Sequence, residues 1–196
     1  MDVPAPPLWQ SLLLEQPWPL AVVLLLAAIV LRMTARRVVS RGVGLAAIGA
    51  ALLAAIVVTL AYTVETGREA VERRTLELVR TASPVDASAL AGLLARDVVI
   101  AGPTGDVVIE GEAVHEQIVT AHDRYGVADH RVRDLDAWAS GQQGRVMLAL
   151  YSTVSSTPAL TRWGLFWEKR EGEPWRIVEV RWLSYQGQEP NMGWVR

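Results

Sequence analysis

The sequence predicts an α+β protein in which a two-helix transmembrane hairpin precedes one domain of about three helices packed on a curved antiparallel sheet. Three observations lead to this prediction. Between Trp18 and Val64 the only charged residues are four arginines. Beyond that segment, helical periodicity is followed by four long runs with strand alternation. The 196 residues leave room for one ordinary domain besides a membrane segment, but not for two.

The second apolar run predicts a membrane-spanning helix over residues 43–64, a stretch without any charge. A helix rises about 1.5 Å per residue, so roughly 20 residues cross the ~30 Å hydrocarbon core of a bilayer. A soluble helix of this length would be expected to have a polar face, which this run lacks.

The first apolar run, over residues 18–33, is shorter, and two interpretations of its start remain open. Residues 1–17 either include a short interfacial helix, or the span begins near Leu12 and is kinked at Pro17 and Pro19. A cleaved signal peptide fits poorly, because the basic residues follow the apolar stretch instead of preceding it. The two runs together therefore predict a helical hairpin.

Arginines between the two runs predict the orientation of this hairpin. By the positive-inside rule the connecting loop is cytoplasmic, so both termini and the C-terminal domain lie on the opposite face. Lys169 is the only lysine in a chain rich in Ala, Val, Leu and Arg, which indicates a GC-rich bacterial genome. We therefore expect an inner-membrane protein with a periplasmic domain. The residues that determine this topology are Arg32, Arg36, Arg37 and Arg41.

Small residues recur at every fourth position of the second run, at Gly42, Ala46, Ala50 and Ala54, with Ala47, Ala51 and Ala55 on a second line beside the first. Such a line lets helix backbones approach closely, and it would serve as a packing face for the first helix or for another protein's helix. The alternative is that alanine is simply abundant here. Neither run has an ionisable residue deep inside it, which argues against a channel or transporter.

The domain is expected over residues 65–186, followed by a tail over 187–196. Amphipathic periodicity, the N-cap candidate Asp86 and the C-cap candidate Gly126 predict its helices. Turn residues separate the predicted strands. The expected elements are helices over 67–81, 87–94 and 112–125, short strands over 97–101 and 107–110, and long strands over 131–139, 145–155, 160–169 and 175–185.

This order of elements resembles the NTF2-like superfamily, in particular its SnoaL-like branch, over residues 68–185. The resemblance is carried by LAGLLARDVVI, GEAVHEQI, DHRVRDLDAWASGQQGRVMLALYSTV and EPWRIVEVRW. It implies a cone in which a curved sheet wraps over the helices, with a cavity at the wide end. Family members use that cavity as an enzyme pocket or a ligand site, or fill it in a scaffold for assembly. The membrane hairpin is outside the family pattern.

An enzyme of this fold needs a general acid or base inside the cavity. His130 opens the first long strand, where SnoaL-like proteins often carry a histidine. Strand alternation places Asp134 on the same face but ~13 Å away, so a bridging residue such as Tyr151 or Tyr125 would be needed. These three residues, His130, Asp134 and Tyr151, are the catalytic candidates. The alternative for His130 is an ordinary hydrogen-bonded histidine at a strand edge.

No metal or cofactor is expected from the sequence. His115 and His122 are seven residues apart on a predicted helix, which separates them by ~10 Å and does not suit a shared metal ion. The chain has no cysteine and no glycine-rich phosphate loop. The net charge of −2 gives no indication of nucleic-acid binding.

The chain has eight tryptophans against one phenylalanine, and five of them lie in the predicted sheet. Some are expected to fill the core, whereas others on the outer face would mark a protein contact. Trp163 and Trp167 are the candidates in the sheet. Trp194 is a further candidate, because a tail has no core to enter.

The function expected from these patterns is that of a membrane-anchored, non-catalytic accessory or assembly subunit. Its partners would be the lipid bilayer and other membrane-protein subunits. The alternative is a membrane-tethered SnoaL-like enzyme of the isomerase, dehydratase or cyclase type, or a binder of a small apolar ligand.

Overall fold

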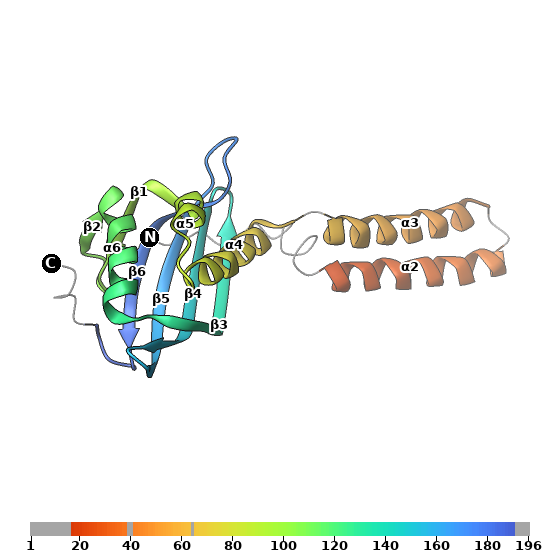
Figure 1. The fold of residues 1–196 in the computed structure, drawn as a ribbon. Helices are drawn as coiled ribbons and strands as arrows, with labels where there is room; N and C mark the ends of the chain where they lie inside the picture. Colours follow the sequence, from red (N-terminus) through yellow and green to blue (C-terminus); the bar gives the residue numbers. More distant parts are fainter. Residues whose placement is uncertain (1–16, 39–40, 64, 191–196) are drawn as a thin grey trace. The chain divides into compact units, whose positions relative to one another are not determined.

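The computed structural model describes residues 17–38, 41–63 and 65–190. Two compact units make up the chain, and the boundary between them falls between Thr66 and Gly67. Figure 1 shows a pair of helices and an α+β domain, each of which is described by itself.

The helical unit consists of α2 (Pro17–Val38) and α3 (Arg41–Thr63), which pack side by side (Figure 1). By length and composition, the segment Gly42–Leu60 of α3 is the one helix among the described residues able to cross a membrane, since the apolar part of α2 is shorter. Large apolar side chains cover the exposed surface of both helices, among them Val23, Leu26, Val30, Leu45, Leu52 and Leu60.

Buried alanines lie where α2 and α3 pack together. Ala47 and Ala54 of α3 are buried, whereas Ala50 is half-buried and Ala46 is exposed. The contact line therefore has a seven-residue spacing, which joins Ala47 of one predicted four-residue line to Ala54 of the other. Four residues advance about 40° beyond one full turn, while seven fall only about 20° short of two, so the seven-residue line stays on one face.

The domain is built on a six-stranded sheet with strand order β2-β1-β6-β5-β4-β3. Its β1 runs parallel to β6 and every other neighbouring pair is antiparallel, so the sheet is mixed and not purely antiparallel as predicted. The parallel pair arises because the chain crosses between β2 and β3 to the far edge before the meander returns. The strands are β1 (Leu94–Ala101), β2 (Val107–Glu110), β3 (Ala128–Ser140), β4 (Gln143–Val154), β5 (Thr157–Glu168) and β6 (Arg176–Tyr185).

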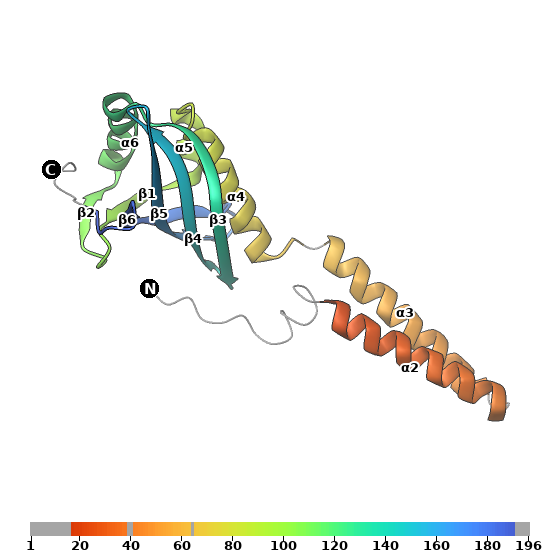
Figure 2. The ribbon, with the colours of Figure 1, turned by 90° about the horizontal axis from the view of Figure 1, so that it is seen from below.

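Three helices cover the inner, concave face of this sheet, as Figure 2 shows. They are α4 (Gly67–Thr81), α5 (Ala87–Leu93) and α6 (Glu112–Tyr125), close to the predicted ranges. Asp86 caps α5, since its carboxylate accepts hydrogen bonds from the backbone N–H groups of Ser88 and Ala89 at 3.0 Å each. Gly126 ends α6 in the left-handed conformation, with φ of 55°.

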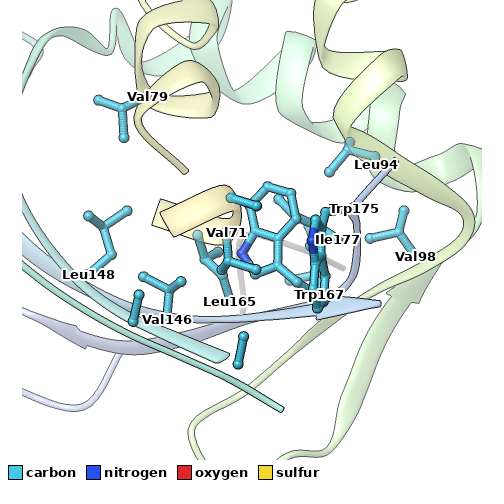
Figure 3. Close-up of a cluster of buried hydrophobic side chains, with 14 of the residues drawn as sticks. Val71, Val79, Leu94, Val98, Val146, Leu148, Leu165, Trp167, Trp175 and Ile177 are labelled. Carbon is cyan, nitrogen blue, oxygen red and sulfur yellow. The ribbon is translucent and has the colours of Figure 1, made fainter. Parts of the chain in front are cut away.

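The core lies between α4 and the inner face of β4, β5 and β6 (Figure 3). Trp167 and Trp175 are 1% and 5% exposed and pack with Val71, which is fully buried. Gly144 on β4 makes this packing possible, because a Cβ atom there would lie 2.8 Å from Cγ2 of Val71. At this point α4 and β4 approach too closely to admit a side chain.

Candidate functional site

Polar and aromatic side chains gather on the inner face of the sheet, at the end away from the start of α4. Strand alternation and register bring them together, since on each strand every second residue points inward. Ser152 lies two residues beyond the buried Leu150, and Thr161 is the cross-strand partner of that leucine. We call this set the inner-face site: His130, Ser152, Thr161, Trp163, Trp182 and Tyr185.

His130 is the titratable group of the inner-face site. Its Nδ1 lies 2.8 Å from Oγ of Ser152, and its ring also hydrogen-bonds to the backbone carbonyl of Ala82. Burial lowers the pKa of His130 below its ordinary value of 6.5, and the nearby His122 lowers it further, while the Ala82 carbonyl and Asp129 oppose the shift. The neutral ring therefore predominates at neutral pH. In the neutral ring whose proton is on Nε2, Nδ1 accepts a hydrogen bond from the Ser152 hydroxyl.

The distance between His130 and Ser152 suits a nucleophile and its general base, but their surroundings do not. Ser152 is only 6% exposed, so a substrate has little access to its hydroxyl. The ring is held by a backbone carbonyl, which stabilises an imidazolium less than the carboxylate of a catalytic triad does. His130 therefore serves as a structural link that joins β3 to β4 and to the segment between α4 and α5.

The other two catalytic candidates lie on the outer face of the sheet. A β-bulge between Val132 and Asp134 shifts the register, so Asp134 pairs with Ala149 and points away from His130, contrary to the expected alternation. Tyr151 is 45% exposed on the same outer face, with the guanidinium carbon of Arg133 5.5 Å from its ring centre. The structure therefore does not bring the predicted acid–base constellation together.

Aromatic rings form the other half of the inner-face site. Trp163 and Trp182 stack with their ring centres 5.5 Å apart and their planes 11° apart, and Tyr185 meets Trp182 edge-on at 6.3 Å. Nε1 of Trp163 donates to Oγ1 of Thr161 at 2.9 Å. Both indoles are half-buried. The arrangement offers a flat apolar wall beside a hydroxyl and a neutral imidazole.

The remaining sequence candidates are dispersed. Trp167 is 1% exposed in the core, which removes it from any contact surface. Arg32 is exposed on α2, and His115 is half-buried on α6. Trp194 lies outside the described residues. Nothing is described of the side chains of Arg36, Arg37, Arg41 and Tyr125.

A polar groove of about 310 Å³ lies beside the turn between β5 and β6. Its arginines are largely neutralised within the domain. Arg170 pairs with Asp97 at 2.9 Å and with Glu168 at 3.2 Å, and Arg176 pairs with Glu173 at 3.6 Å. Charges that are already paired favour a solvated edge of the sheet over an anion-binding site.

The sequence did not reveal the partners of His130. Counting outward from the β3–β4 turn in strict register pairs His130 with Thr153, but the bulge brings Ser152 to the imidazole instead. Thr161 and Tyr185 were also missed, although period-two alternation from Trp163 would have placed Thr161 on its face. Ala82 is distant in sequence and joins the site only through the packing of α4 on the sheet.

Comparisons with known proteins place the domain by its fold. No protein-family model matches the chain, and no curated protein matches it in sequence. An NTF2-like protein from Cytophaga hutchinsonii is 14% identical, covers 61% of this chain and 99% of its own, and superposes with a TM-score of 0.50. An NTF2-like protein of unknown function from Pseudomonas putida is 10% identical over 66% of this chain and 91% of its own, with a TM-score of 0.52.

The CaMKII hub of S. rosetta is also similar, at 17% identity over 63% of this chain and 99% of its own, with a TM-score of 0.51. These likenesses define the class of the domain, which has the NTF2-like fold. At such identities they show the fold alone, and the activity has to be argued from the residues.

Proposed function

We propose that this chain is a membrane-anchored, non-catalytic accessory or assembly subunit of a membrane complex, with its NTF2-like domain on the periplasmic side. The observation that carries the proposal is the helical unit. Its two helices pack through small residues and leave large apolar side chains exposed, a surface suited to lipid and to other membrane helices. The short apolar part of α2 would cross the bilayer as the partner of α3 in a hairpin.

The polar residues of the domain also favour a non-catalytic role. His130 is held by Ser152 and Ala82, while the carboxylate of Asp134 points to the other face of the sheet. A general acid–base mechanism requires such groups within hydrogen-bond reach of one substrate. Among the described residues the candidate acid and base are on opposite faces.

The test is extraction of the full chain in a mild detergent, followed by identification of the proteins that copurify. We expect defined membrane-protein partners, and we expect Ala46→Leu to weaken their recovery, because Ala46 is exposed on α3. Ala47→Leu is the matched control that perturbs the contact with α2 instead, since Ala47 is 4% exposed. A chain that runs alone as a monomer or homodimer would overturn the subunit role.

Orientation is tested separately by labelling introduced cysteines. This labelling is specific because the chain contains no cysteine of its own. A membrane-impermeant maleimide added to spheroplasts should label Tyr151→Cys in the domain. It should label Ser40→Cys, in the segment between the two helices, only after the membrane is opened. The reverse pattern would place the domain in the cytoplasm.

The stacked Trp163 and Trp182 support a second candidate function, the binding of a small apolar or planar ligand at the inner-face site. A half-buried aromatic wall with few polar groups is typical of ligand pockets. The membrane-tethered enzyme is the catalytic form of this candidate. A ligand screen by thermal shift, repeated with Trp163→Leu, tests it: a hit that persists unchanged in the variant binds elsewhere.

A further inference from the structure

An exposed tryptophan lies at the end of the sheet where the domain begins. Trp138 is on the outer face of β3 and is 42% exposed. Its neighbour Ala139 points inward, and its Cβ atom is 3.2 Å from the position that a Cβ atom on Gly67 would occupy. Figure 2 shows this end of β3 beside the start of α4. Trp138 is thus next to the first residue of the domain.

The chain between Gly67 and the apolar segment of α3 is short. That segment ends at Leu60 and the helix itself ends at Thr63. Three helical steps and four extended residues reach at most about 19 Å, and the headgroup layer occupies roughly 5–8 Å outside the hydrocarbon core. When α3 crosses a bilayer, the covalent chain therefore holds this end of the domain close to the lipid headgroups.

The surface around Trp138 suits that environment. We define the Trp138 corner as Trp138, the turn 140–143 and Arg145, the cross-strand partner of the tryptophan. None of these residues is a carboxylate, and Gln142 and Gln143 are exposed. Two carboxylates flank the corner: Asp136, two residues before Trp138 on β3, and Glu168, the cross-strand partner of Gln143, which is paired with Arg170. No ion pair joins Arg145 to a carboxylate within the described part of the chain. Indole rings favour the membrane interface, and guanidinium groups are attracted to anionic phospholipids.

We propose that the Trp138 corner rests in the headgroup layer of an anionic membrane and fixes the orientation of the domain on it. This inference rests on the membrane anchor of the proposed function. Tyr151 provides the contrast within the same outer face. It is similarly exposed, at 45%, but lies six residues beyond Arg145 along β4, or about 20 Å away, so the far end of the sheet remains in water.

The experiment uses the full chain in vesicles of phosphatidylcholine and phosphatidylglycerol, at a low ratio of protein to lipid. Single cysteines labelled with the fluorophore NBD are introduced by Gln142→Cys, Gln143→Cys, Tyr151→Cys and Leu52→Cys, so that Trp138 is retained in every labelled chain. The quenchers are a lipid with a nitroxide in its headgroup, a lipid with a nitroxide in its acyl chain, and aqueous iodide. Leu52 lies within the apolar segment of α3 and reports insertion of the anchor.

We expect the headgroup nitroxide to quench the labels at positions 142 and 143, and iodide to quench the label at 151. Adding Trp138→Ala to the Gln142→Cys chain should abolish the headgroup quenching at position 142, because the anchoring indole is gone. Vesicles of phosphatidylcholine alone should weaken it, because the attraction of Arg145 to anionic lipid is lost.

Three outcomes overturn the proposal, and they are distinguishable. Equal iodide quenching at positions 142 and 151, with the Leu52→Cys label quenched by the acyl-chain nitroxide, shows that the anchor is inserted but that the Trp138 corner does not contact the membrane. Shielding of position 142 from iodide without quenching by lipid indicates a contact with a second copy of the chain. A Leu52 label accessible to iodide shows that α3 is not inserted, and the proposed function fails together with the inference.

Discussion

Substitution of Gly144 by alanine tests the close approach of α4 to the sheet. The new Cβ atom would lie 2.8 Å from Cγ2 of Val71, 3.2 Å from Cβ of Trp167 and 3.3 Å from Cζ3 of Trp175. Carbon atoms pack best at about 3.5–4.0 Å, and all three neighbours are at most 5% exposed, so none has free space to enter. Overpacking of this kind costs about 1–3 kcal/mol.

The free energy of unfolding is measured by urea denaturation of the full chain in detergent micelles, followed by tryptophan fluorescence. Gly92→Ala is the matched control. It lies in α5 with nothing within 4 Å of the new Cβ atom, and it should stabilise the domain by up to about 1 kcal/mol through helix propensity. Val71→Ala removes the closest clashing methyl group.

The double variant Gly144→Ala with Val71→Ala should therefore be less destabilised than the sum of the single variants, by roughly 0.5–3 kcal/mol. Strict additivity of the two changes, or a Gly144→Ala chain as stable as the wild type, would refute the reasoning about this contact.

Three further predictions concern His130, Asp86 and α3. Because burial lowers the folded-state pKa of His130, its contribution to stability is fully present above its ordinary pKa of 6.5 and is lost as pH falls through the folded value. The free energy of unfolding measured against pH should show this loss, and His130→Gln should flatten the pH profile. An unchanged profile in the variant would assign the pH dependence to other groups. Asp86→Ala should lower the melting temperature, because two N–H groups of α5 lose their acceptor. Asp86→Asn should retain most of the stability, since an amide oxygen accepts the same hydrogen bonds. Equal losses in both variants would mean that the charge of Asp86, and not its capping hydrogen bonds, stabilises the helix. Ala51→Arg, at an exposed position in the apolar segment of α3, should make the free energy of membrane insertion less favourable by about 3 kcal/mol. Carbonate extraction should then release the variant from the membrane fraction. A variant that stays in the membrane fraction like the wild type would contradict the assignment of α3 as a span.

Local patterns predicted the elements of the domain because each pattern is set by neighbouring residues. Alternation predicted the long strands from β3 to β6, although β3, β4 and β5 begin two or three residues earlier than predicted and β6 begins one residue later. The caps at Asp86 and Gly126 predicted helix ends from side-chain chemistry and glycine's tolerance of positive φ. The order of these elements was sufficient to indicate an NTF2-like cone.

Positions that depend on register could not be predicted in the same way. The bulge after Val132 placed His130 and Asp134 on opposite faces and brought His130 to Ser152. A one-residue shift in register changes the face of every side chain beyond it, and no local signal in the sequence marked the shift. The parallel pairing of β1 with β6 similarly depends on strands about 80 residues apart in the chain.

By itself the sequence determined the uncharged apolar segment of α3, the four arginines at the two helices, and the α+β order of the domain, because hydrophobicity and periodicity are local properties. Only the tertiary structure decided which alanines pack between α2 and α3, that Trp167 is core, and that His130 is held between Ser152 and Ala82. It also decided that Trp138 stands exposed beside the start of α4. These relations depend on helix phase and strand register, which become fixed only when distant segments pack together.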